Sequence, residues 1–134
     1  MSQQRFNERK ADAVNAAARL MALATAPGDD VIRDATIQRF EFTFEAVWKA
    51  LKLYLDHQGL QANSPREVFR QAFAEKLIET EEEADEWIAM LEDRNLTSHV
   101  YREALAEEIY VSILASHAQR LNNMADKIGG LTWR

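Results

Sequence analysis

The sequence predicts an all-α protein, an antiparallel up-down bundle of four to five helices in one domain spanning residues 1–134. Three observations favour this fold class. Apolar residues recur at spacings of three and four. No window alternates with period two for long enough to indicate a strand. Glycine and proline number only four and two, and they lie where helices are expected to break. A length of 134 residues is the size of one domain.

The expected breaks are APGDD (26–30), HQGLQANSP (57–65) and IGG (128–130). The first helix is predicted over about 3–25, with an apolar face of Phe6, Ala13, Ala17, Leu20, Met21 and Ala24. The second is predicted over about 31–57, with a stripe of Ile37, Phe40, Phe44, Val47, Leu51 and Leu55.

The second helix also carries Phe42, Trp48 and Leu53 outside its main stripe. A helix that is apolar on more than one side contacts more than one neighbour. This pattern predicts either a central position in the bundle or a place at a subunit interface. We expect a homodimer whose interface includes this helix and the connector at residues 92–101.

The next two helices begin at capping signals. Ser64 is a predicted N-cap, followed by Pro65 at the first helical position and Glu67 at the third. Thr80 and Glu83 repeat the capping-box spacing and open a fourth helix. The last helix is expected from about 102 to 127, with Leu105, Ile109, Ile113, Leu121 and Met124 on its apolar face.

Composition limits the classes of function. The net charge of −6 disfavours broad nonspecific binding to nucleic acid, so no DNA partner is expected, but a small cationic pocket remains compatible with it. There is no cysteine, and hence no thiolate metal site. No apolar run approaches the roughly 18 residues of a membrane span, and the start MSQQRFNERK lacks the apolar core of a signal peptide. We expect a cytoplasmic protein without a membrane partner.

The stretch EDRNLTSHVY (92–101) places Arg94, His99 and Tyr101 together where the hydrophobic pattern lapses. A histidine changes protonation near neutral pH, so it can act as general base or acid on a ribose hydroxyl or a leaving oxygen. An arginine can hold a phosphodiester through two hydrogen bonds and stabilise the charge that develops on it. These groups suffice to cleave RNA through its own 2′-hydroxyl without a metal.

Asn95, Thr97 and Ser98 offer neutral hydrogen bonds that could orient the two catalytic candidates. The spacing imposes a condition, because five residues of continuous helix leave Arg94 and His99 about 140° apart. The two side chains converge only if the helix ends or distorts between them, or if a second chain contributes. A twofold dimer would also supply separate histidines as base and acid.

Three motifs in order, RFEFTFEAVWKALKLYL, SPREVFRQAFAEKLI and MLEDRNLTSHVY, resemble the prokaryotic HEPN-domain proteins, first called nucleotidyltransferase substrate-binding proteins. The likeness is strong from about 35 to 125 and looser over the first helix. It implies a homodimeric antiparallel bundle, encoded beside a minimal nucleotidyltransferase.

Many members of that family carry an Arg-x4-His ribonuclease motif and act as the toxin of a toxin–antitoxin pair. In a subgroup, the partner transfers AMP onto a tyrosine two residues after the histidine and silences the ribonuclease. Arg94, His99 and Tyr101 match this pattern without departure, and Asn95 fits the polar residue after the arginine. The resemblance thus implies Arg94 and His99 as catalytic residues, Asn95 and Ser98 as polar support, and Tyr101 as the AMP acceptor.

Other polar residues favour structural roles. His57 is expected at a helix C-terminus, where it interacts with the helix dipole, and His117 at the surface or at an interface. Glu41 and Glu45 are expected to pair with Arg39 or Lys49 or to lie in a polar patch near the dimer axis. These carboxylates lack a further ligand at helical spacing, so no metal or other cofactor is expected.

Two functions therefore remain open from the sequence. One is a metal-independent endoribonuclease of toxin type, acting on RNA and neutralised by its nucleotidyltransferase. The other is a non-catalytic subunit that recruits substrate for that nucleotidyltransferase. The intact motif favours the first.

Overall fold

The computed structural model describes residues 3–133, and every regular element in that range is helical. The α-helices are α1 (Gln3–Ala24), α2 (Asp30–His57), α3 (Pro65–Ala74), α4 (Glu81–Leu96), α5 (Glu103–Ser112) and α6 (Ala118–Gly129). A 3₁₀ turn, Thr97–His99, follows α4, and a π-helical segment, Ile113–His117, joins α5 to α6. Because α5, this segment and α6 run on without a break, they form the single last helix that the sequence predicts, and the all-α fold is confirmed.

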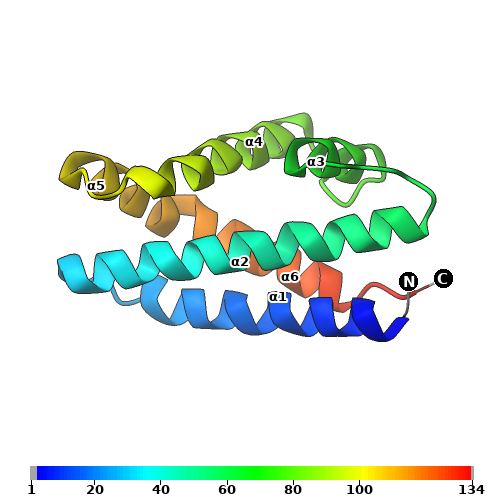
Figure 1. Ribbon diagram of the computed structural model, residues 1–134, viewed down its shortest axis with the longest axis horizontal. Coiled ribbons are helices and arrows are strands. Elements are labelled where there is room, and N and C mark those ends of the chain that lie inside the picture. The colour runs from blue at the N-terminus through cyan, green and yellow to red at the C-terminus, as the bar shows by residue number, and fades with distance from the viewer. Residues whose placement is uncertain (1–2, 134) are drawn as a thin grey trace.

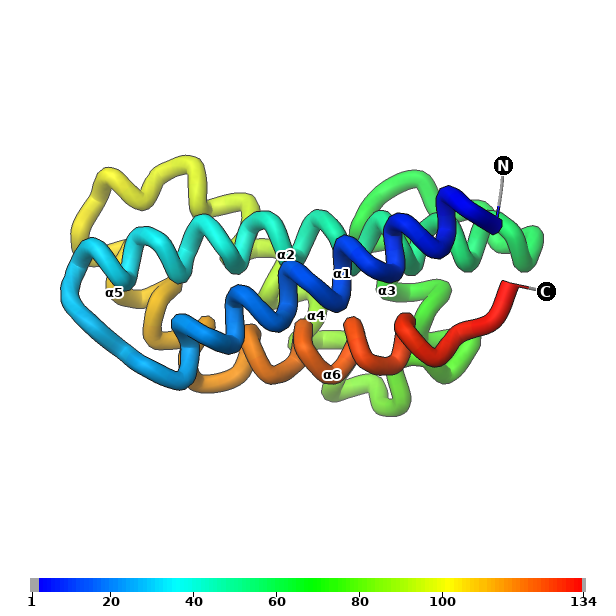
Figure 2. The backbone as a smooth tube through the Cα atoms, turned by 90° about the horizontal axis from the view of Figure 1, so that it is seen from below, coloured from blue at the N-terminus to red at the C-terminus, as the bar shows by residue number. Residues whose placement is uncertain are grey.

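The long helices alternate in direction, and the two ends of the chain lie at the same end of the bundle (Figure 1). Helix α2 is central, since it packs against α1, α3, α5 and α6, while α1 also packs against α6 (Figure 2). Of the two explanations for its two-sided apolar surface, the central position is therefore confirmed. Leu53 is buried and Trp48 half-buried, whereas Phe42 remains 55% exposed.

Both predicted helix caps are confirmed. Ser64 Oγ accepts a hydrogen bond from the backbone N–H of Glu67, and Thr80 Oγ1 accepts one from the backbone N–H of Glu83. Asp29 caps α2 in the same way. Such caps satisfy backbone donors that a helix start leaves unpaired, so they fix where α2, α3 and α4 begin.

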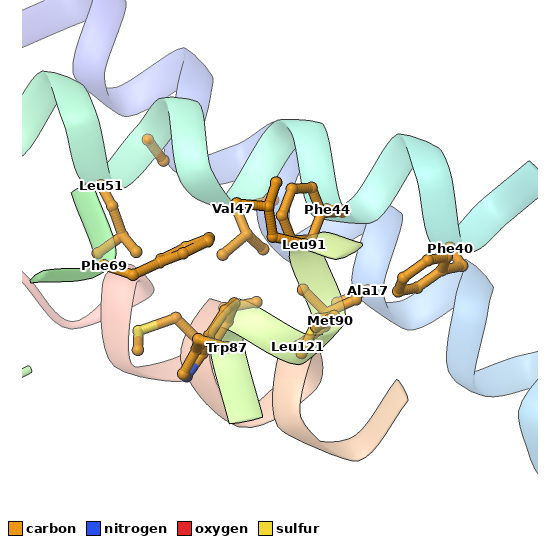
Figure 3. Close-up of a cluster of buried hydrophobic side chains, with 14 of the residues drawn as sticks. Ala17, Phe40, Phe44, Val47, Leu51, Phe69, Trp87, Met90, Leu91 and Leu121 are labelled. Carbon is orange, nitrogen blue, oxygen red and sulfur yellow. The ribbon is translucent and has the colours of Figure 1, made fainter. Parts of the chain in front are cut away.

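Aromatic packing joins α4 to the central helix (Figure 3). The rings of Phe44 and Phe69 lie 5.8 Å apart, and those of Phe69 and Trp87 lie 4.9 Å apart, centroid to centroid. Met90 and Leu91 of α4 are buried in the same cluster. Since aromatic residues bury about 150–250 Å² each, this cluster holds α4 firmly enough to position the residues at its C-terminal end.

A buried arginine with three exposed acidic partners fixes the start of α5. Arg33 of α2 is 4% exposed and contacts Asp34, Glu103 and Glu107 at 2.9, 2.9 and 3.1 Å. Its hydrogen bonds to Glu103, Asp34 and Glu107 raise the pKa of Arg33 above its ordinary value. The first turn of α5 is thus tied to α2, immediately after the segment that carries His99 and Tyr101.

Trp133, a residue without a role assigned from the sequence, packs against the end of the bundle where α1 begins and α2 ends. His57, the last residue of α2, stacks on Trp133 with ring centroids 3.6 Å apart, and Trp133 lies 5.0 Å from the ring of Phe6. This contact between the C-terminal segment and both α1 and α2 gives His57 a packing role. Across residues 3–133, no helix is both long and apolar enough to cross a bilayer.

Candidate active site

Helix α4 extends further than the sequence predicts. It runs to Leu96, so Arg94 lies in its last turn rather than in a connector covering 92–101. The α-helix ends at Thr97, whose backbone N–H donates to the carbonyl of Arg94. The hydroxyl Oγ1 of Thr97 donates to the same carbonyl at 2.7 Å, and a 3₁₀ turn follows. The helix therefore changes between Arg94 and His99, as their spacing requires if they are to act together.

The guanidinium of Arg94 is held by side chains from two helices. Its Nη1 donates to Thr97 Oγ1 at 3.2 Å, and its Nη2 donates to Glu45 Oε1 at 3.3 Å. Glu41 lies 3.9 Å from Nη1. Arg94 is half-buried, so these contacts restrain its guanidinium and set the direction in which this group would face a ligand.

Glu41 and Glu45 contact Arg94, so the predicted pairing with Arg39 or Lys49 was wrong, while their place near a dimer axis stays a prediction. Arg39 instead donates to the backbone carbonyl of Arg19 on α1. The carboxylates meet Arg94 because the last turn of α4 approaches the middle of α2.

His99 and Tyr101 form an exposed pair on the other side of the turn. His99 Nδ1 lies 3.5 Å from the Tyr101 hydroxyl, and the two rings meet edge to face with centroids 6.0 Å apart. Tyr101 is 73% exposed, and the guanidinium of Arg102 lies 5.7 Å from the centre of its ring. The tyrosine hydroxyl is therefore within reach of a large ligand and close to the imidazole.

Of the three residues expected to orient Arg94 or His99, Thr97 does contact Arg94, whereas Asn95 and Ser98 contact each other. Ser98 Oγ donates to the backbone carbonyl of Asn95 at 3.4 Å, and both residues are exposed. Thr97 contacts Arg94 directly. The structure thus brings Arg94 together with Thr97 and Glu45, and His99 together with Tyr101.

The prediction for His117 was wrong, because this residue is buried rather than at the surface. It is 6% exposed; its Nε2 lies 2.7 Å from Asp93 Oδ2, and its ring stacks on Phe40 with centroids 5.5 Å apart. His117 is the last residue of the π-helical segment. A π-helical segment changes the direction of the side chains that follow, relative to a regular α-helix, and the hydrophobic pattern does not reveal it. The Asp93 contact anchors the last turn of α4 one residue before Arg94.

No group of three or more His, Cys, Asp or Glu side chains in residues 3–133 is arranged to hold a metal ion. The site itself offers a restrained guanidinium, an exposed imidazole, a phenol and two carboxylates. This set of groups suits a phosphate ester and the movement of a proton. Fold and site together define a small helical bundle with a cluster of polar and ionisable side chains at the end of α4.

Comparison with known proteins identifies the family. A family model described as "Nucleotidyltransferase substrate binding protein like" matches residues 4–129. The chain belongs to this family, which confirms the resemblance stated from its motifs.

Two related proteins extend this comparison. A protein of Haemophilus influenzae named "Probable ribonuclease HepT" is 28% identical over 89 residues, a match that covers 63% of this chain and 59% of that protein. A Thermus thermophilus protein of known crystal structure shares 42% sequence identity with this chain, and the two structures superpose with a TM-score of 0.79. The match covers 87% of this chain and 98% of that one. The helical fold described above is therefore shared with a solved relative.

Proposed function

We propose that this protein is a metal-independent endoribonuclease of toxin type, whose catalytic residues are Arg94 and His99. The observation that carries the proposal is the geometry at the end of α4. There, Thr97 and Glu45 restrain Arg94, and the following 3₁₀ turn places His99 on the exposed surface. The similarity to a protein named as a probable ribonuclease supports the same activity.

In the proposed reaction, the RNA supplies its own nucleophile. The 2′-oxygen forms a bond to phosphorus, the bond from phosphorus to the 5′-oxygen breaks, and a 2′,3′-cyclic phosphate remains. One histidine takes the proton from the 2′-hydroxyl, and an acid returns a proton to the departing 5′-oxygen. Arg94 stabilises the additional negative charge on the phosphoryl oxygens.

A homodimer would supply both proton-transfer groups. One His99 cannot readily serve as base and acid in the same step, whereas a twofold arrangement presents the same residue from each subunit. We therefore propose that residues 94–101 of the two subunits face each other across the dimer axis, with one His99 as base and the other as acid.

We further propose that a cognate nucleotidyltransferase neutralises the ribonuclease by transferring AMP to Tyr101. The tyrosine oxygen attacks the α-phosphate of ATP, pyrophosphate leaves, and the phenolic proton passes to a base. The product carries a negative charge and a bulky nucleoside beside His99, where it would exclude RNA and compete for Arg94. The family description supports a nucleotidyltransferase partner.

The test of the catalytic assignment is cleavage of RNA by the purified protein in EDTA. His99→Ala should lose about 10²–10⁴ in rate, since proton transfer typically contributes that much. His99 is exposed, so this variant should remain folded. Activity of His99→Ala equal to that of the wild-type protein would refute the assignment.

The test of the switch is Tyr101→Phe, which keeps the ring and removes the AMP acceptor. The variant should cleave RNA at close to the wild-type rate but resist neutralisation when co-expressed with the nucleotidyltransferase. Mass spectrometry of the wild-type protein from the same co-expression should show AMP on the peptide containing Tyr101. An unmodified peptide from a silenced complex would mean that inhibition occurs by binding alone.

The second candidate function is a non-catalytic substrate-binding subunit of a two-component nucleotidyltransferase. The family description favours it, and so does the occupation of Arg94 by Glu45 and Thr97, because a phosphate must compete with an existing carboxylate. This function predicts no RNA cleavage by the wild-type protein, together with a partner whose nucleotidyl transfer to a third molecule depends on this chain.

A further inference from the structure

A basic groove lies between α1 and α2, away from the residues assigned above. Its cavity of about 280 Å³ is lined by Arg5, Arg9, Trp48, Lys49, Lys52, Leu53 and Asp56. The two arginines are one helical turn apart on α1, and the two lysines are three residues apart on α2, so each helix contributes one wall. We call this feature the α1–α2 groove.

The charge of the groove is opposite to that of the whole molecule. It gathers four cationic side chains and one carboxylate in a chain whose net charge is −6. The carboxylate, Asp56, is paired with Lys52 at 3.0 Å. Glu8 and Asp12 line a separate hollow on α1, which they share with Arg5 and Arg9. A polyanion is thus attracted into the α1–α2 groove and repelled from the acidic side of α1.

The groove is connected to the candidate active site through one face of α2. Trp48, which lines the groove, donates its indole N–H to Glu45, and Glu45 accepts from Arg94. Positions 45, 48, 49 and 52 fall within about 100° of one another on a helix. From Glu45 to Lys52 the helix rises about 10.5 Å, which is the length of about three stacked nucleotides.

We propose that the α1–α2 groove binds the single-stranded RNA chain next to the bond that is cut. Arg9, Lys49 and the neighbouring cations contact its phosphates, and the half-buried indole of Trp48 offers a face on which a base can stack. We expect the groove to recognise charge and length rather than sequence, since its cationic side chains suit phosphates, and phosphate contacts carry no sequence information. This inference rests on the proposed function, because RNA is the ligand that the end of α4 is proposed to cleave.

The test compares two double variants that remove the same charge. Arg9→Gln with Lys49→Gln alters both walls of the groove, and Arg70→Gln with Lys76→Gln removes two exposed cations of the α3 region, outside the groove. Binding of a fluorescent RNA octamer is measured by anisotropy over a range of salt, with His99→Ala in every protein so that the RNA stays intact. Cleavage of the octamer and of a dinucleotide is measured in proteins with His99 present.

In a plot of the logarithm of the RNA association constant against the logarithm of the salt concentration, loss of two phosphate contacts should make the slope less steep by about 1.4. Octamer binding should then be about 25-fold weaker at 0.1 M salt. The control pair should bind as the unmodified background does. Cleavage of the dinucleotide should be unchanged in the groove pair, because so short a substrate does not reach the groove, whereas a distorted active site would slow both substrates.

Equal octamer binding by the groove pair and the control pair would overturn the inference. If the wild-type protein cleaves RNA and the groove pair binds it normally, the groove assignment fails while the proposed function stands. If the wild-type protein cleaves no RNA but its octamer binding still depends on Arg9 and Lys49, the groove stands and the ribonuclease proposal fails.

Discussion

Replacing Asp93 with alanine should destabilise the protein through a residue 24 positions away. Asp93 Oδ2 lies 2.7 Å from Nε2 of His117, and the His117 side chain is only 8% exposed. In the Asp93→Ala variant, Nε2 would lose its partner at a site that is largely shielded from water. Leaving a buried polar atom without a partner costs about 1–3 kcal/mol.

Helix propensity partly offsets this loss. Alanine favours a helix over aspartate by up to about 0.7 kcal/mol, so the free energy of unfolding should fall by roughly 1–2 kcal/mol. An entropy of unfolding of about 2.1 cal/mol/K per residue gives roughly 280 cal/mol/K for a chain of 134 residues. The melting temperature should therefore fall by about 4–7 °C.

The measurement is thermal unfolding followed by circular dichroism at 222 nm. Glu92→Ala is the matched control, because Glu92 is the preceding residue of α4, is exposed, and carries the same charge. It should melt within about 2 °C of the wild-type protein, as surface substitutions usually change stability by less than 0.5 kcal/mol. Equal melting temperatures for Asp93→Ala and Glu92→Ala would refute the argument that the buried histidine depends on Asp93.

Two further predictions concern the site and the assembly. Thr97→Val removes the hydroxyl that accepts from Arg94 Nη1 and donates to the backbone carbonyl of Arg94. The variant should lower the free energy of unfolding by about 1 kcal/mol and kcat by roughly 10- to 100-fold, because the guanidinium would be misplaced. An unchanged kcat in steady-state cleavage would exclude Thr97 as a positioning residue. Light scattering at micromolar concentration should give about twice the chain mass of 15.4 kDa, because the proposed reaction needs His99 from each of two subunits as base and acid. A mass of one chain would rule out the homodimer.

The sequence by itself determined which segments are helical and where α3 and α4 begin, but not where α4 ends. Periodicity at three and four residues reveals which face of each helix is buried, and the caps at Ser64 and Thr80 depend only on neighbouring residues. The motif around Arg94, His99 and Tyr101 is local as well, so the sequence could place these residues together and could identify the family.

Only the tertiary structure decided which polar groups meet between helices. Arg94 and Glu45 are 49 residues apart, and His117 finds Asp93 across a π-helical segment that shifts its rotation. The α1–α2 groove likewise depends on how two helices are rotated and offset along their axes. Amphipathic periodicity fixes an inward face within a broad stripe, but it leaves that rotation and offset undetermined; the packing of the whole core sets them.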